Sequence, residues 1–190
     1  MQYEYFFLRF LKSLAPFSEI ELNAAKALFK IIILQKNDFF VKAGHFSDRI
    51  AFVQSGLLRS YFTTKDKEVT TFFALPGSVC MDARSFLVMK QSLESIEALV
   101  TSELLVIDRK DLYTLYHENW KWQKVGRLLL EKYFIASEER TIALQSLTAH
   151  ELYEQFVAEF PDVVQMVPQH YIASYLGITP ETLCRVRHIK

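Results

Sequence analysis

The segment PQHYIASYLGITPETLCRVRHIK, residues 168–190, carries the strongest structural signal in the chain. A helix over 169–176 would turn three apolar side chains to one side, namely Ile172, Ala173 and Leu176. Gly177 follows at the point where a helix end favours the left-handed conformation, which glycine adopts without steric cost. The spacing therefore predicts a short helix that ends at a glycine corner.

A second short helix is predicted directly after this corner. Thr179 can cap its start, and Pro180 suits the first helical position. Leu183 and Val186, three residues apart, would face the first helix, and the small Ala173 would let the two helices cross closely. This pattern predicts a helix-turn-helix, with a plain pair of closing helices as the alternative.

In a helix-turn-helix the second helix enters the major groove and its first residues meet base edges. Arg185 can pair with guanine, Glu181 can accept from a cytosine amine, and Thr182 can meet a thymine methyl or a phosphate. The start of the first helix would face backbone phosphates. The predicted DNA contacts are Gln169, His170, Thr179, Pro180, Glu181, Thr182, Arg185 and His188.

The charge distribution favours the same end of the chain. The 190 residues have a formal net charge of zero, which by itself argues mildly against nucleic-acid binding. Residues 163–190, however, hold three basic residues (Arg185, Arg187 and Lys190) against one acidic residue. The positive charge is thus concentrated where a small DNA-reading unit would need it.

A long helix is predicted upstream, capped by Asn119 and running to about Ser146. Apolar and small residues recur along it every seven residues at two offsets, which is typical of a coiled-coil dimer. The predicted seam is Trp122, Gly126, Leu129, Tyr133, Ala136, Arg140, Ala143 and Leu147. Four further apolar residues lie off this seam and are expected to pack on the β-rich part: Leu128, Phe134, Ile135 and Ile142. The alternative is a core helix within a monomer.

From Ile31 to Asp108 the texture is that of a β-structure, with short β-branched and aromatic runs separated by turns. Gly44, Gly56 and Pro76-Gly77 mark turns, and residues 65–68 (KDKE) form a charged hairpin tip. Strands at this spacing predict an antiparallel sandwich or jelly roll. Short helices are expected on either side, over 18–29 and 111–117.

The composition predicts a protein of the cytoplasm. The longest apolar runs are too short to cross a bilayer, and the aromatic N-terminus lacks the basic start and cleavage site of a signal peptide. The two cysteines, Cys80 and Cys184, lie far apart and form no disulfide framework. Both are expected to be small buried hydrophobic residues.

Five segments in this order resemble the Crp/Fnr family of bacterial transcription regulators: FFVKAG (39–44), FVQSGLLRSYF (52–62), FFALPGSV (72–79), SIEALVTSELLVID (95–108) and VPQHYIASYLGITPETLCRVR (167–187). The last of these is the most specific. The resemblance implies an α+β fold in three parts. These are an N-terminal antiparallel β-roll of the cyclic-nucleotide-binding type (1–118), a dimerisation helix (119–147) and a helix-turn-helix domain (148–190).

The resemblance also implies a function. The chain would bind a pseudo-palindromic operator as a homodimer, under the control of a small effector in the β-roll, and would not be an enzyme. Double-stranded DNA and a second copy of the chain are the expected partners. RNA polymerase is a further candidate partner, and no membrane is involved.

The effector region departs from the pattern of the cyclic-AMP-binding members of the family. Those members hold the phosphate with a short helix after a Gly-Glu pair and with a following Arg-Ser pair. Here Asp82 falls near the Glu, Met81 replaces the Gly, and no arginine lies near Ser92 and Ser95. Without that arginine a cyclic nucleotide is a doubtful cofactor. The candidate effector contacts are Arg59, Gly77, Ser78, Asp82, Ser92 and Ser95, although Arg59 has the alternative of a surface or salt-bridged strand arginine.

Two other kinds of protein compete with this prediction. One is a regulatory module with a degenerate sensor pocket, which acts through protein contacts and no longer reads DNA. The other is a metal enzyme of the cupin type, which needs clustered His and Glu ligands. Of the five histidines only His45 lies in the β-rich region, so no metal site is predicted.

Overall fold

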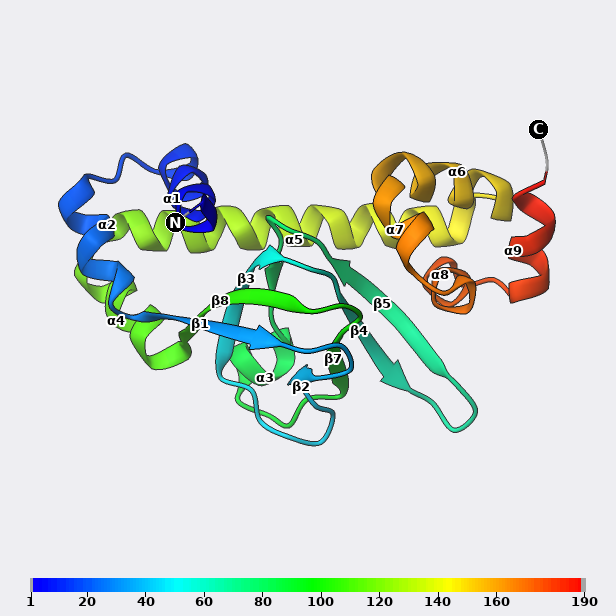
Figure 1. Ribbon diagram of the computed structural model, residues 1–190, viewed down its shortest axis with the longest axis horizontal. Helices are drawn as coiled ribbons and strands as arrows, with labels where there is room; N and C mark the ends of the chain where they lie inside the picture. Colours follow the sequence, from blue (N-terminus) through cyan, green and yellow to red (C-terminus); the bar gives the residue numbers. More distant parts are fainter. Residues whose placement is uncertain (1, 189–190) are drawn as a thin grey trace. The chain divides into compact units, whose positions relative to one another are not determined.

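A computed structural model describes residues 2–188, with side chains from residue 7 onward (Figure 1). The chain forms two compact units. The first comprises the chain up to Ser60 together with Phe73–Glu131. The second comprises Tyr61–Phe72 together with the chain from Lys132 onward. The boundary between the two units therefore falls inside the long helix. The tip of one β-hairpin belongs to the second unit, together with the C-terminal helices.

The strands form two four-stranded sheets, with the orders β1-β8-β3-β6 and β2-β7-β4-β5. Figure 1 shows β8 between β1 and β3, and β8 pairs antiparallel with both. The strands are β1 (Phe29–Leu34), β2 (Phe39–Val41), β3 (Arg49–Ser55), β4 (Leu58–Thr63), β5 (Glu68–Ala74), β6 (Val79–Cys80), β7 (Glu94–Ala98) and β8 (Ser102–Asp108). This confirms the predicted antiparallel β-roll and the α+β fold.

Alternate residues of the first sheet face two separate cores, because successive side chains point to opposite sides of a strand. On one side Ala51, Val53 and Leu104 pack against buried residues of the second sheet. On the other side Phe52 and Ile107 belong to a cluster that includes buried residues of the helices. The first unit therefore has an inner core between its sheets and an outer core beneath its helices.

Helices close the outer core of the first unit. They are α1 (Gln2–Leu14), α2 (Glu19–Lys26), α4 (Arg109–Glu118) and the first half of α5 (Trp120–Ser146), while the short α3 (Ala83–Val88) follows β6. The α2 and α4 helices correspond to the two predicted short helices. Asn119 accepts a hydrogen bond from the backbone of Lys121, which confirms the predicted cap.

An ion pair joins α2 to the start of α5. Lys121 Nζ lies 2.8 Å from Glu21 Oε1, and Asn119 donates to the same oxygen. The hydrogen bond from Lys121, followed by those from Ser18, lowers the pKa of Glu21 to about 2. Glu21 also completes a capping box with Ser18, so one carboxylate both starts α2 and ties it to α5.

The second unit consists of the tip of the β4–β5 hairpin, the second half of α5 and four further helices. These are α6 (Ala149–Glu159), α7 (Pro161–Met166), α8 (Gln169–Leu176) and α9 (Pro180–Val186). Ser174 joins the hairpin to α8, because its hydroxyl accepts from Thr70 N at 2.9 Å and donates to Glu68 O at 3.1 Å. The predicted charged tip lies at the turn between β4 and β5.

A substitution at Gly56 tests how closely the backbone segments pack in the first unit. Its φ is +95°, and an added Cβ would lie 2.5 Å from the Ser102 Cα. We expect Gly56→Ala to lower the free energy of unfolding by at least about 3 kcal/mol, since backbone strain and a clash with backbone add together. Gly44 is the matched control, because its φ is +82° but an added Cβ would meet nothing within 4 Å.

Gly44→Ala should therefore cost only the strain of about 1–2 kcal/mol. Urea unfolding of both variants, followed by circular dichroism, measures the difference. Equal losses in the two variants would contradict the proposed contact between Gly56 and Ser102.

Candidate nucleic-acid interface and sensor region

The C-terminal helices have the geometry that the sequence predicts. The α8 helix ends at Gly177 with φ +69°, and Ile178 N donates to Ala173 O across the corner at 3.0 Å. Thr179 then caps α9 by accepting from Thr182 N at 3.2 Å, and Pro180 occupies the first helical position. The corner and the second cap thus fix the direction in which α9 leaves α8.

An apolar core holds these two helices. The five predicted inward residues are all buried: Ile172, Ala173, Leu176, Leu183 and Val186. The α6 helix packs against both α8 and α9. It also contributes Phe156, whose ring centre lies 5.4 Å from that of Tyr175 on α8. Because the apolar sides of α8 and α9 are used in this core, their polar sides face solvent.

The predicted DNA contacts lie on these polar sides. Thr182 is half-buried, and the other seven are exposed: Gln169, His170, Thr179, Pro180, Glu181, Arg185 and His188. Thr179 and Pro180 also have a structural task, since they start α9. Hydrogen bonds from its own backbone N–H and from Thr179 lower the pKa of Glu181. Glu181 therefore remains an ionised acceptor at the start of α9.

Two basic side chains lie on or beside the exposed side of α9. Arg185 is exposed in the last turn of α9, and within the described residues its guanidinium makes no hydrogen bond or ion pair. Arg187 is exposed at the end of the same helix. The sequence prediction used Arg187 only for its charge. Lys190, the third basic residue of this segment, lies outside the described residues.

The two cysteines differ from each other. Cys80 is buried as predicted, and burial raises the pKa of its thiol to about 12, with a smaller contribution from Glu94. Cys184 is exposed, so the prediction of a second buried thiol is wrong. The reason is its position one residue after Leu183, which turns its side chain away from the apolar side of α9.

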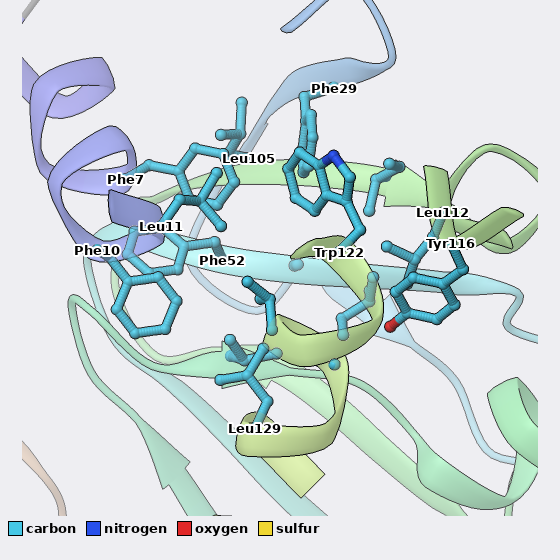
Figure 2. Close-up of a pocket in the computed structure, with 16 residues that line it drawn as sticks. Phe7, Phe10, Leu11, Phe29, Phe52, Leu105, Leu112, Tyr116, Trp122 and Leu129 are labelled. Atoms are coloured by element: carbon cyan, nitrogen blue, oxygen red, sulfur yellow. The ribbon is translucent and has the colours of Figure 1, made fainter. Parts of the chain in front are cut away.

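The first half of the predicted dimer seam is wrong. Trp122 is only 4% exposed and packs on Phe17 inside its own unit, with ring centres 4.8 Å apart. Leu129 packs against the same core, and Gly126 lies so close to the Tyr116 hydroxyl that a side chain would clash. Figure 2 shows Trp122 and Leu129 among the side chains that line a cavity of this core. A seven-residue period shows which side of a helix is buried, but it does not show whether the same chain or a partner chain covers that side.

The second half of the seam also faces its own unit in part. The Arg140 guanidinium carbon lies 3.8 Å from the centre of the Tyr175 ring, and Arg140 donates to the Tyr175 carbonyl at 2.6 Å. Ala143 and Leu147 are half-buried, whereas Tyr133 and Ala136 are exposed. Arg140 therefore stabilises the contact between α5 and α8.

Exposed apolar side chains also occur along α5 outside the buried seam. Phe134, Ile135 and Ile142 are 64%, 56% and 61% exposed, so the prediction that they pack on the β-roll is wrong, while Leu128 is half-buried.

A stripe of exposed side chains follows one side of the helix, and we call this stripe the α5 face. It consists of Leu130, Tyr133, Phe134, Ser137, Thr141 and Leu144. Ile135 and Ile142 lie roughly a quarter turn or more away from it, since each residue turns an α-helix by about 100°.

The predicted effector contacts have roles in the fold. Arg59 is 1% exposed, and its guanidinium donates to Glu97 Oε1 at 2.9 Å. Arg59 is therefore a salt-bridged strand arginine, which was the alternative to an effector contact. Asp82 caps α3 by accepting from Ser85 N. Gly77 makes a turn with φ +91°.

The three serines of the set also bind backbone. Ser78 accepts from Leu75 N, Ser95 accepts from Ala43 N, and Ser92 bonds the backbone of Glu94. None of the six predicted effector contacts lines either of two cavities in the first unit, which have volumes of about 60 Å³ and about 200 Å³.

No three His, Cys, Asp or Glu side chains among the described residues are grouped so that they could hold a metal ion. Such a group is what the cupin alternative requires. None of the helices described is both long enough and apolar enough to span a bilayer.

Known proteins share parts of this sequence pattern and this geometry. The family model of the cyclic nucleotide-binding domain matches residues 31–119. No curated protein sequence matches the chain. Similar solved structures are numerous, and FixK2 from Bradyrhizobium japonicum has a TM-score of 0.72 at 19% identity, over 84% of this chain and 82% of FixK2.

Two other structures extend the match over more of this chain. The Catabolite Activator Protein of Thermus thermophilus has a TM-score of 0.57 at 21% identity, over 94% of this chain and 84% of its own. A Crp/Fnr-family transcriptional regulator from Eubacterium rectale has a TM-score of 0.66 at 14% identity, over 92% and 85%. At these identities the likeness establishes the fold. Residues 31–119 therefore match the cyclic nucleotide-binding domain, and the chain as a whole shares the fold of these solved structures.

Proposed function

We propose that the chain is a DNA-binding transcription regulator of the Crp/Fnr type, which binds a pseudo-palindromic site as a homodimer. The observation that carries this proposal is the polar side of α9, where Glu181 and Arg185 are exposed above a buried helix-turn-helix core. Residues at the start of such a helix meet base edges in the major groove. Similar structures described as a catabolite activator and as a regulator of virulence gene expression favour the same function.

The α5 face is the surface on which we propose that two copies pair. Its exposed Leu130, Phe134 and Leu144 form an apolar stripe, and Ser137 between them allows two helices to approach closely. A twofold pair suits a pseudo-palindromic site, because half-sites one helical turn apart mirror the symmetry of the protein. This surface shares only Tyr133 with the seam that the sequence predicted.

The hairpin contact suggests how the β-roll would influence α8. β4 carries the buried Arg59 in the first unit and continues into the hairpin whose backbone binds Ser174. A shift of β4 by an effector in the β-roll would therefore act directly on the helix-turn-helix. A cyclic nucleotide is not part of this proposal, because the phosphate-binding arginine of the family is missing and Glu94, bonded to Ser60, supplies a negative charge nearby.

Arg185→Ala tests the reading helix. Against a duplex selected from random sequences, this variant should lose about 10-fold to 100-fold of its preference over a shuffled duplex, since an arginine pair to guanine supplies about 1–3 kcal/mol of discrimination. Fluorescence anisotropy titrations of both duplexes measure the ratio. Sedimentation should show that the variant associates as the unchanged protein does.

Arg187→Ala is the matched control for Arg185→Ala. It removes the same charge two residues later and should weaken binding to both duplexes by a similar factor. If Arg185→Ala kept the full sequence preference, the assigned role of Arg185 would be wrong. If the unchanged protein had no preference, the protein-contact alternative would be favoured.

Phe134→Glu tests the α5 face. A carboxylate placed in a paired apolar stripe is desolvated, so this variant should dissociate to monomers at micromolar concentration while keeping its circular dichroism spectrum. Ile135→Glu is the matched control, because its side chain is as exposed but lies off the stripe, and it should leave the dimer intact. Analytical ultracentrifugation distinguishes the two outcomes. A dimer that survives Phe134→Glu, or one that Ile135→Glu disrupts equally, would contradict the proposed surface.

A further inference from the structure

Two segments of the first unit lie side by side at one end of the β-roll (Figure 1). One is the connection between β2 and β3, and the other runs from the start of α3 to the start of β7. Ser47 N, in the connection, donates to Ser85 Oγ of α3 at 2.7 Å. Gly44 N donates to Ser92 O, in the second segment, at 2.8 Å. These hydrogen bonds hold the two segments together as one surface.

Five large apolar side chains project from this surface into solvent. The α3 helix buries Ser85 and Phe86, so its opposite side is exposed, since each residue turns an α-helix by about 100°. Exposed apolar side chains that gather in one place with charged residues around them mark interaction surfaces. We call this set the α3 patch, and each of its members is at least 43% exposed: Phe46, Leu87, Val88, Met89 and Leu93.

The charge around the α3 patch is mainly positive. Arg84 and Lys90 are exposed, and their side chains make no hydrogen bond or ion pair with any described residue. Lys42 is exposed as well. All residues of the two segments are described, and Asp48 is the only exposed carboxylate among them. An acidic partner would therefore meet positive charge that the chain itself does not neutralise.

The kinds of side chain favour a protein partner over a lipid surface. Phe, Met and Arg are enriched in protein–protein interfaces, and Phe46, Met89 and Arg84 are of these types. Trp and Tyr, which anchor proteins at a membrane interface, do not occur in the two segments. Met89 also has a φ of +55°, which strains any residue except glycine. Its exposed apolar side chain is thus present at a cost in stability, as is common at functional positions.

We propose that the α3 patch binds a short acidic segment of another protein, in which Asp or Glu residues accompany large apolar side chains. Contacts with Val88 and Met89 supply most of the affinity, whereas Arg84 and Lys90 select acidic segments. The inference does not depend on DNA binding, because the α3 patch belongs to the first unit and α9 to the second.

Peptide selection tests the proposed chemistry of the partner. A phage library of random short peptides, selected against the full chain, should enrich peptides that combine Asp or Glu with large apolar residues. An enriched peptide with a fluorescent label is then the probe for anisotropy titrations. Arg185→Ala should leave its affinity unchanged, which shows that the peptide does not occupy the polar side of α9.

Val88→Asp should weaken binding of the labelled peptide at least about tenfold, because it removes an apolar contact and places a carboxylate opposite an acidic peptide. Ile33→Asp is the matched control and should leave the affinity unchanged. Both side chains are β-branched and 60% exposed, but Ile33 lies on β1, outside the α3 patch. Circular dichroism verifies that both variants are folded.

The charges are tested by Lys90→Glu. This variant should weaken binding about threefold to tenfold at low salt, and the difference should vanish near about 1 M salt, where exposed charges are screened. Lys36→Glu, an exposed lysine in the turn after β1, is its control and should have no effect.

Met89→Gly separates binding from stability. It should weaken binding of the peptide while raising the urea midpoint, because glycine adopts this φ without strain. A side chain with a purely structural role would leave the affinity for the peptide unchanged.

Several results would overturn the proposal. One is a selection that enriches no acidic peptide. Another is an affinity that Val88→Asp and Ile33→Asp change equally. Association with phosphatidylglycerol vesicles that Val88→Asp abolishes would identify a lipid surface instead. Self-association that the same variant abolishes in sedimentation would identify a second copy of the chain as the occupant.

Discussion

The orientation of α9 depends on one packed corner. Gly177 adopts the left-handed conformation between α8 and α9, and Ile172, Leu176, Leu183 and Val186 are buried around it. A residue with a side chain would be strained at this φ, and a wider turn would pull the apolar sides of the helices apart. Because this core buries the largest apolar side chains of α9, Leu183 and Val186, the opposite side of α9 is the part left for recognition. The proposed DNA contact is thus a consequence of the corner.

Different sides of the α5 helix lie in three different environments. Its first half buries Trp122 beneath the helices of the first unit, and its second half stacks Arg140 on Tyr175 in the second unit. The remaining side, around Phe134, stays apolar and exposed. An exposed apolar stripe of this kind is costly for a protein that stays a monomer, and it favours association of two copies. The same helix therefore connects the core of the β-roll, the helices that we propose read DNA, and the proposed dimer.

Local signals in the sequence predicted the corner, the caps and the limits of α5, because glycine, threonine and asparagine act on their immediate neighbours. The sequence could not tell which surface covers a helix, so the period through Trp122 suggested a partner chain where the structure has its own core. Contacts between distant residues were equally hidden. Ser174 binds the hairpin near Thr70, and this contact does not follow from spacing along the chain. Two of the predicted effector residues likewise bond to distant elements, since Arg59 pairs with Glu97 and Ser95 accepts from the backbone of Ala43.

The most direct test of the account is a titration of the unchanged protein against a selected duplex and a shuffled duplex of equal length, repeated over a range of salt concentrations. The account predicts two chains per duplex, at least about 10³-fold tighter binding to the selected sequence, and an affinity that falls as salt rises, because phosphate contacts release counterions. Binding that is equal for the two sequences at every salt concentration, or that is absent for both, would contradict it.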